Sequence, residues 1–386
     1  MKAIIAMRFL VVIETQKVKA YLFASPIMRE TRGGSVLLDS LNRKETKTIL
    51  KGLGNVRYEE IYLGGGSGRV LFENKHDAEK FKKEVLELYH RKTINARVSV
   101  EIVERETKAG KDESFAEWVI RGVLIAQQNK LGRVEGVPVL AGRWIRPCTS
   151  CGSEPAEMPL SEHDEHWLCR ACSLKRESVN GLYKDIKSTK RGYKVLKSSS
   201  ELASKYTDNF IFSTLAKEAN CQVSLPQDFD EIGQSSRPSN YMGFIYADGN
   251  RMGETIKEIG RLFPKDEDAK RAYKAFSEIV DRATREAAVK AVLQVVDLKE
   301  SKTVDGMLRF IPAEFIMAGG DDLMLAVPSH NAMDVAVLFI ERFQEKTKEL
   351  QDDYIEKGML LKPFAKEGLT TSAGVVIAHA HYPVRV

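Results

Sequence analysis

Three acidic residues in the C-terminal half have the types and the spacing of a metal-dependent site for phosphate chemistry. Asp321 and Asp322 follow two glycines in Gly319-Gly320-Asp321-Asp322, between two apolar segments that are typical of strands. Asp248 ends another apolar segment, residues 242–248. Converging carboxylates repel one another unless a cation neutralises them, and Mg²⁺ or Mn²⁺ binds carboxylate and phosphate oxygens together. Two such ions can activate a 3′-hydroxyl and stabilise a pyrophosphate leaving group.

The residues beside these acids suit contact with a triphosphate, and all of them are small: Gly249, Asn250, Gly253, Gly319 and Gly320. Glycine allows a positive φ in the turn and removes a side chain where a phosphate must approach the backbone. Residues 248–253 also have the form of a loop whose N–H groups face phosphates at the start of a helix. Gly-Gly-Asp-Asp alone is equally good hairpin chemistry. The additional acid, and a segment from 314 to 328 without any basic residue, favour the catalytic interpretation.

Four cysteines between the two halves have the spacing of a structural zinc site. Cys148-x-x-Cys151 and Cys169-x-x-Cys172 each offer two thiolates from one turn, and together they complete a tetrahedral Zn²⁺ shell without an open position. Disulfides or a redox motif are the alternatives, and the pairing of two such motifs favours zinc. His163 or His166 in the intervening loop could replace one cysteine as a ligand.

The acidic segments need a scaffold that brings them to one edge, and the element order of the C-terminal half supplies it. Hydrophobic periodicity predicts the order βαββαβ, with strands at 242–248, 309–317, 323–327 and 369–378 and helices at 268–298 and 331–357. In this order the third strand inserts between the first and the second. The first strand and the hairpin therefore end at the same edge of the sheet, which sets Asp248 beside Asp321 and Asp322.

The N-terminal half repeats this order. Strands are predicted at 8–14, 58–63, 69–74 and 96–103, and helical segments at 28–52 and 77–91. LGGGSGRVLF (63–72) aligns without a gap with MAGGDDLMLA (317–326). In this alignment Ser67 and Gly68 correspond to the two acids of the second hairpin. Any two α+β segments can be aligned, but the shared Gly-Gly hairpin favours duplication. We expect the first copy to be non-catalytic, because it lacks those acids.

Together these features predict an α+β protein of three parts. Residues 1–106 form a degenerate ferredoxin-like βαββαβ palm domain, and residues 226–386 form a catalytic one. Residues 107–225, a helical linker with the zinc module, join the two palm domains. The 386-residue chain is 43% hydrophobic with a net charge of +5, which permits a polyanionic partner. Its basic stretch 175–197 is either a solvated surface or a phosphate contact. Arg8 interrupts the apolar start and no run reaches the roughly 20 residues of a membrane span, so we expect a cytoplasmic protein.

The ordered combination of a degenerate palm, a four-cysteine module and a palm with Gly-Gly-Asp-Asp resembles the large subunit of type III CRISPR effector complexes of the Csm and Cmr type. The resemblance extends over nearly the whole chain and includes PIMRETRGGS (26–35) and GVVIAH (374–379). It implies conversion of ATP into cyclic oligoadenylates, by attack of one ATP 3′-hydroxyl on the α-phosphorus of another. Asp248, Asp321 and Asp322 would hold Mg²⁺ or Mn²⁺, and the four cysteines would hold zinc. The implied partners are the other complex subunits with crRNA and target RNA.

The family pattern differs here in two places. Members often begin with an HD nuclease domain and continue into a helical C-terminal domain, whereas here the palm pattern starts almost at Met1 and ends near Val386. We therefore expect a short form without HD-type DNase activity, with the dipeptides His76-Asp77 and His163-Asp164 in a helix and in the zinc loop. A non-catalytic scaffold subunit and a stand-alone diguanylate-type cyclase are the alternative functions. The oligomeric state stays open.

Overall fold

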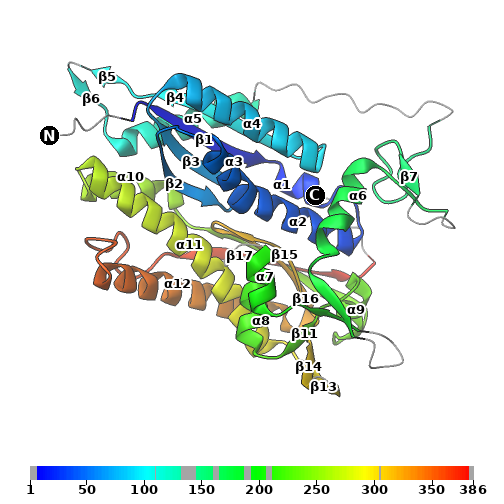
Figure 1. The fold of residues 1–386 in the computed structure, drawn as a ribbon. Coiled ribbons are helices and arrows are strands. Elements are labelled where there is room, and N and C mark those ends of the chain that lie inside the picture. Colours follow the sequence, from blue (N-terminus) through cyan, green and yellow to red (C-terminus); the bar gives the residue numbers. More distant parts are fainter. Residues whose placement is uncertain are drawn as a thin grey trace.

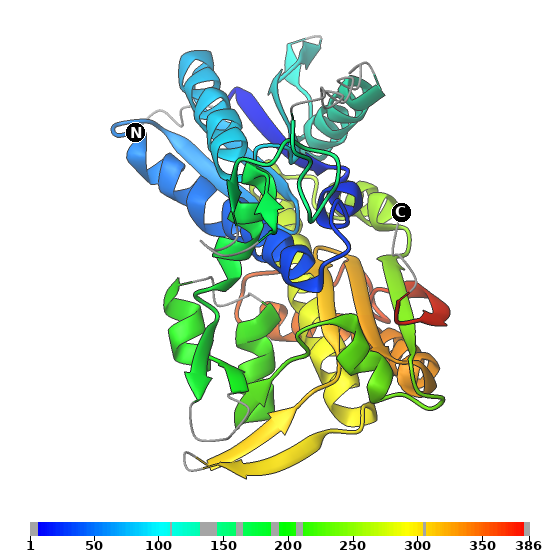
Figure 2. The same ribbon diagram turned by 90° about the vertical axis from the view of Figure 1, so that its right-hand side faces the viewer.

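The computed structural model describes residues 7–108, 110–131, 145–159, 165–186, 193–205, 211–303 and 306–381. The expected α+β class is confirmed: helices surround several mainly antiparallel sheets, and the N- and C-terminal halves stack on each other (Figure 1, Figure 2). No helix in these described segments is long and apolar enough to cross a membrane.

The N-terminal unit is a four-stranded sheet in the order β2-β3-β1-β4. Its strands match the predicted ones: β1 (Phe9–Gln16), β2 (Tyr58–Gly64), β3 (Ser67–Phe72) and β4 (Arg97–Glu104). Its helices are α1 (Val18–Leu22), α2 (Met28–Ser40), the π-helical turn η1 (Leu41–Glu45), α3 (Thr46–Gly52) and α4 (Lys75–Thr93). Asn74 caps α4, because its side-chain oxygen accepts a hydrogen bond from the Asp77 amide at 2.9 Å. The His76-Asp77 dipeptide lies in the first turn of this helix, as predicted.

The C-terminal unit has the equivalent order β15-β16-β12-β17, so in both units the third strand lies between the first and the second. Its elements are β12 (Tyr241–Gly249), α10 (Met252–Leu262), α11 (Asp266–Val295), β15 (Glu314–Gly319), β16 (Asp322–Pro328), η2 (Ser329–Asn331), α12 (Ala332–Glu356) and β17 (Thr371–His379). The long helix α11 packs on β2 of the first unit and on β15 and α12 of the second, and it therefore joins the two units (Figure 1).

One predicted strand, residues 309–317, is wrong. The segment turns at Ile311-Pro312-Ala313, where the Ala313 amide donates to the Ile311 carbonyl at 2.8 Å and Pro312 has no N–H for a ladder. Only β15 enters the C-terminal sheet; β14 (Gly306–Phe310) joins a five-stranded sheet in the order β13-β14-β11-β10-β9. The other four strands of that sheet are β9 (Tyr183–Ile186), β10 (Tyr193–Leu196), β11 (Gln222–Ser224) and β13 (Lys299–Thr303). This sheet spans the predicted domain boundary at residue 225, and the division into three domains stays a prediction.

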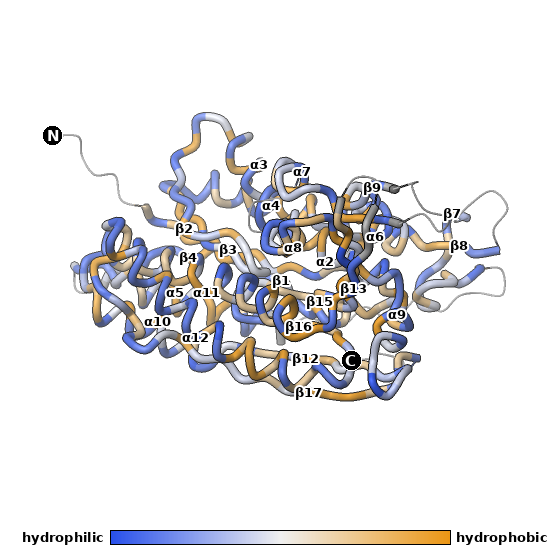
Figure 3. The backbone as a smooth tube through the Cα atoms, turned by 90° about the horizontal axis from the view of Figure 1, so that it is seen from below, coloured by the Kyte–Doolittle hydropathy of each residue, from blue (hydrophilic) through white to orange (hydrophobic). Residues whose placement is uncertain are grey.

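The middle segment packs on both units. Helix α5 (Phe115–Leu131) covers one face of the N-terminal sheet, where Trp118 is 1% exposed and shares a core with Leu10 and Val12. The remaining elements are β5 (Thr107–Lys108), β6 (Lys111–Asp112), β7 (Met158–Pro159), β8 (Trp167–Leu168), α6 (Arg170–Val179), α7 (Ser199–Lys205), α8 (Ile211–Ala219) and α9 (Phe229–Gln234). Hydrophilic and hydrophobic residues alternate along the helices, as expected for helices that bury one face (Figure 3).

Candidate active site

The Gly-Gly-Asp-Asp segment forms the predicted hairpin, between β15 and β16. Gly319 pairs with Asp322 and closes a two-residue turn made of Gly320 and Asp321. Gly320 has a φ of +61° whereas Asp321 has a negative φ, as in a type II′ turn with glycine in the first position. On α11, Thr284 donates to the Gly320 carbonyl at 2.7 Å, and an Asp281 oxygen accepts from the Gly320 amide at 3.1 Å. Helix α11 therefore holds the turn at both polar groups of Gly320.

Asp248 lies beside this hairpin, one residue before the end of β12. In the β12–β16 ladder Ala247 pairs with Leu323, so Asp248 lies next to Asp322, close enough for a hydrogen bond when one of the two is protonated. Asp248 is exposed, whereas the two acids of the hairpin are half-buried. Burial and the charges of Asp322 and Asp248 raise the pKa of Asp321 to about 6, and burial and Asp248 also raise the pKa of Asp322. Within the described part of the chain, too little positive charge therefore lies near these three carboxylates to balance their negative charges.

One cation from the other unit reaches this site. Lys19 on α1 lies over the ring of Tyr246, with its Nζ 3.6 Å from the ring centroid, and the Tyr246 hydroxyl donates to Asp322 Oδ1 at 2.7 Å. Neither residue was predicted from the sequence. Tyr246 could have been found, because strand periodicity puts it on the same face of β12 as Asp248. Lys19 could not, because only the stacking of the two units brings it near.

Beneath the turn, Asp281 lies between two arginines. Arg43 from η1 and Arg285 from the next turn of α11 both donate to its carboxylate, and all three residues are at most 4% exposed. Burial raises the pKa of Asp281, but Arg285, Arg43 and the Gly320 amide outweigh burial and lower it below its ordinary value. This buried network ties the N-terminal unit to the acidic turn.

The predicted phosphate loop has two parts with different surroundings. Asn250 Oδ1 accepts from the Ser372 hydroxyl at 2.8 Å, so Asn250 ties the loop to β17. A Cβ on Gly249 would lie 2.7 Å from the Cβ of Asp321, so glycine there lets Asp321 approach the end of β12. Gly253, in the first turn of α10, has open space where a Cβ would lie, and it is therefore accessible to a ligand.

The first hairpin differs from the predicted alignment by one residue. Gly64 pairs with Ser67 and encloses Gly65 and Gly66, which both have positive φ. The places of the two aspartates are therefore taken by Gly66 and Ser67, one residue before the predicted Ser67 and Gly68. A run of three glycines allows two gapless alignments, and only the strand pairing distinguishes between them.

The first copy keeps one acid, at the position of Asp248. In the β1–β3 ladder Glu14 pairs with Ser67, which takes the place of Asp322. Asp248 has the same position in the C-terminal unit, next to Asp322. Arg69, which is 4% exposed, donates to Glu14 Oε1 at 2.6 Å, whereas the C-terminal unit has Met324 at the place of Arg69. An internal guanidinium thus neutralises the acid of the first copy, and no guanidinium of the described residues does so for Asp248 in the second.

The two hairpins contact each other through their glycines. A Cβ on Gly65 would lie 2.4 Å from the Gly320 nitrogen, a distance that real Cβ atoms do not reach. Beside this contact lies a cavity of about 430 Å³, which is in the range of small-molecule sites. Both units line it, among others with Glu14, Ser35, Arg69, Tyr273, Asp321 and Asp322.

The donors of the acidic hairpin are of the kind that Mg²⁺ or Mn²⁺ prefers, because they are carboxylate oxygens short of positive charge. Their carboxylate oxygens lie farther apart than the sulfur atoms of the four cysteines. Within the described segments, only the four cysteines form a group of three or more metal-binding side chains with all donor atoms within 4.8 Å. For one ion to be held by all three acids, the carboxylate oxygens of Asp248, Asp321 and Asp322 would therefore have to move closer together.

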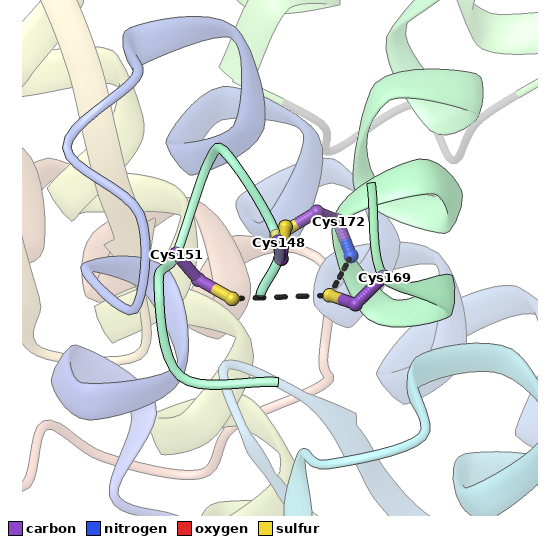
Figure 4. A group of neighbouring side chains, drawn as sticks. All are labelled: Cys148, Cys151, Cys169 and Cys172. Atoms are coloured by element: carbon purple, nitrogen blue, oxygen red, sulfur yellow. Dashed lines mark hydrogen bonds between the residues drawn. The ribbon is translucent and has the colours of Figure 1, made fainter. Parts of the chain in front are cut away.

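The four predicted zinc ligands converge. The Sγ atoms of Cys148, Cys151, Cys169 and Cys172 all lie within 4.8 Å of one another, and those of Cys151 and Cys169 are 3.9 Å apart (Figure 4). Zinc–sulfur bonds of about 2.3 Å in a tetrahedron put the sulfurs about 3.8 Å apart, so the group fits zinc. All five cysteines are free thiols. His166 is not part of the group, so its proposed role as a substitute ligand is wrong; His163 lies outside the described residues.

The segment 26–35, which carries part of the family resemblance, holds this module. Glu30 is completely buried and accepts from the Ser150 hydroxyl at 2.7 Å and from Arg176 Nε at 2.5 Å. A Cβ on Gly33 would lie 1.8 Å from the Lys175 carbonyl oxygen, so α2 and α6 approach each other through this glycine. Lys175 and Arg176 therefore make internal contacts, and the phosphate interpretation of the basic stretch does not apply to them.

Two family models match separate parts of the chain. Residues 241–386 match the model of the Cas10/Cmr2 second palm domain, and residues 34–119 match that of an RNA binding motif. No curated protein gives a significant match.

Solved structures match almost the whole chain. The Csm1-Csm4 subcomplex in the type III-A CRISPR-Csm interference complex matches with a TM-score of 0.55 and 15% identity, over 98% of this chain and 51% of the other. Csm1 in T. onnurineus matches with a TM-score of 0.52 and 14% identity, over 98% and 50%. The chain thus spans about half the length of these matches, which show its fold. The resemblance to the large subunit of type III CRISPR complexes is therefore confirmed: the C-terminal unit matches the second palm domain of Cas10/Cmr2, and the whole chain folds like part of Csm1.

Proposed function

We propose that the chain is an ATP-dependent nucleotidyl transferase that makes cyclic oligoadenylate second messengers in type III CRISPR antiviral defence. The observation that carries the proposal is the acidic turn, short of positive charge, in the wall of a cavity that both units line. Csm1-Csm4 cassettes with a similar fold have been solved in complex with cA3, cA4 and AMPPNP. These ligands support adenine nucleotides as the substrate class.

In this proposal both βαββαβ units are ferredoxin-like palm domains, residues 1–106 degenerate and residues 226–386 catalytic. Asp248, Asp321 and Asp322 hold Mg²⁺ or Mn²⁺, whose charge would offset the triphosphate and favour ionisation of the attacking hydroxyl. Gly319 and Gly320 leave room for phosphates, and the loop with Gly249, Asn250 and Gly253 faces them. The four cysteines hold a structural Zn²⁺ in the linking residues 107–225.

The proposed reaction joins two ATP molecules. The 3′-hydroxyl of one attacks the α-phosphorus of the other, a phosphodiester bond forms, and pyrophosphate leaves; repetition followed by ring closure gives a cyclic product. Tyr246 orients Asp322, and Lys19 is placed to contact a phosphate oxygen. The protein contributes mainly positioning and charge neutralisation.

The proposed partners are other subunits of a type III complex together with crRNA and target RNA. The RNA binding motif match in the N-terminal unit does not locate that RNA, because α5 covers one face of this sheet with Trp118. We therefore assign RNA contacts to surfaces other than this face.

Incubation with each nucleoside triphosphate and Mg²⁺ or Mn²⁺, with and without crRNA complex and target RNA, tests the proposal by mass analysis of the products. A cyclic oligoadenylate is expected. A product made from GTP alone would indicate a diguanylate-type cyclase, and no product under any of these conditions would indicate a scaffold.

A further inference from the structure

A separate cavity, of about 280 Å³, lies where three parts of the chain meet: α2, the end of α6 with β9 and β10, and the loop after β11. Its charged lining residues are Arg29, Arg32 and Lys194, and none of the described residues that line it is acidic. It shares no lining residue with the cavity at the acidic turn.

The three cations of this cavity differ in how far they are neutralised. Arg32 is 5% exposed and already paired, because its Nε donates to Glu314 Oε1 at 3.0 Å. Arg29 Nη2 donates to Asn180 Oδ1 at 2.6 Å, which is a neutral acceptor. The acid next to Arg29 in the chain, Glu30, is instead bonded to Arg176 and Ser150. Lys194 is exposed on β10. Among the side chains that the structure describes, none is an acid paired with Arg29 or Lys194; in the β9–β10 ladder Asp185 stands opposite Lys194.

The remaining polar groups of the wall add hydrogen-bond donors. The Tyr183 hydroxyl is buried close to the Arg32 guanidinium, and its O–H donates to no group in the described part of the chain. Asn180 and Gln227 also line the space. A larger cavity of about 720 Å³ between α7, α8, α11 and α12 is different: there Arg282 pairs with Glu286 and Arg285 with Asp281.

We propose that the 280 Å³ cavity binds a phosphate group, carried by a free nucleotide or by an RNA strand, with Arg29 and Lys194 as its charged contacts and Tyr183 as a neutral donor. Guanidinium and ammonium groups in a wall without a described acid, beside a hydroxyl whose O–H is unused, are complementary to phosphate oxygens. The volume suits a phosphate together with part of its ribose. The site does not depend on the acidic turn or on a divalent cation.

Calorimetric titration tests this proposal with three probes: inorganic phosphate, AMP and 5′-phosphorylated oligo(A) RNA. The titrated protein is the Asp321→Asn plus Asp322→Asn variant without added divalent cation, so that the acidic cavity contributes no metal-dependent binding. We expect at least one probe to bind and Arg29→Gln plus Lys194→Gln to weaken it at least tenfold. The matched control, Lys51→Gln plus Lys80→Gln, removes two exposed lysines on α3 and α4 and leaves the affinity unchanged.

The same titrations separate the two sources of phosphate. Binding of phosphate or AMP, with competition by RNA, identifies a site for a single phosphate group; binding of RNA alone identifies a strand site. Lys194→Gln and Tyr183→Phe, tested singly, each weaken binding measurably and keep the test valid if the Arg29 variant unfolds. Binding of none of the probes, or binding that these substitutions leave unchanged, would overturn the proposal.

Discussion

Gly65 of the first hairpin and Gly320 of the acidic turn lie in backbone contact, so that a Cβ on Gly65 would come within 2.4 Å of the Gly320 nitrogen. The acidic turn is thus held from two directions, by the glycine hairpin of the other unit and by Thr284 and Asp281 of α11. The first copy lacks the acids, yet it forms part of the support of the proposed active site.

Gly65→Ala is expected to destabilise the protein and to displace the acidic turn. The substitution lowers the free energy of unfolding for two reasons: Gly65 has a positive φ of +54°, and the added Cβ clashes with Gly320. Gly54→Ala is a matched control, because Gly54 has a φ of +79° but open space around the Cβ position. Chemical denaturation should give a loss of about 1 kcal/mol for Gly54→Ala and at least ~2 kcal/mol more for Gly65→Ala. Equal losses for the two variants would mean that the hairpins do not touch.

Asp281→Asn is expected to lower the free energy of unfolding at pH 7 by about 3–5 kcal/mol, because it leaves Arg43 and Arg285 buried without a carboxylate. The folded protein holds the pKa of Asp281 below its ordinary value. The ionised form therefore stabilises the fold above about pH 4, and this contribution is lost as the pH falls through the folded pKa.

The free energies of unfolding of wild type and Asp281→Asn, measured against pH, check that prediction. The gap should be constant from about pH 7 to pH 5 and narrow only below about pH 4. Asp352→Asn, which removes an exposed acid on α12, should stay within about 0.5 kcal/mol of wild type. A gap that widens on acidification would contradict the ion-pair account.

Tyr246→Phe is expected to slow product formation roughly 10- to 100-fold, because it removes a hydrogen bond of 2.7 Å to a charged carboxylate. Lys19→Met should raise the KM for ATP, since it removes the cation above Tyr246. Steady-state kinetics check both effects, and Lys80→Met, an exposed lysine on α4, is the control. Wild-type kinetics in both variants, with the Asp321 and Asp322 variants inactive, would show that Lys19 and Tyr246 play no part in the reaction.

The two four-stranded sheets, the acidic hairpin and the four-cysteine group could be predicted from the sequence because each depends on local patterns: strand periodicity, turn residues and short spacings. The five-stranded sheet could not, because its strands come from distant parts of the chain. The alignment of the two hairpins wrongly matched Gly68 with Asp322, because three consecutive glycines can be aligned in two ways. It missed Glu14 as the counterpart of Asp248 because that equivalence follows from strand register. Lys19, Arg43 and the Gly65 contact come from the packing of one unit on the other, which no local pattern encodes.

Cys148→Ser is expected to remove bound metal and to destabilise the module. Structural zinc sites contribute their binding free energy to folding, so a loss of several kcal/mol is expected. Elemental analysis should find about one zinc per wild-type chain and much less in the variant. Cys221→Ser is the control, because Cys221 is a free thiol outside the four-cysteine group. A wild-type protein without zinc, or undiminished stability of Cys148→Ser, would contradict the structural role.

The acidic turn is the centre of the account, and one comparison tests it most directly. Wild type and the Asp321→Asn plus Asp322→Asn variant are incubated with ATP and Mg²⁺ in the presence of crRNA complex and target RNA, and their products are compared by mass spectrometry. Folding of both proteins is verified by their unfolding temperatures. We expect cyclic oligoadenylates from the wild type and at least a thousandfold less from the variant. Equal product from the two proteins would contradict the assignment of the active site.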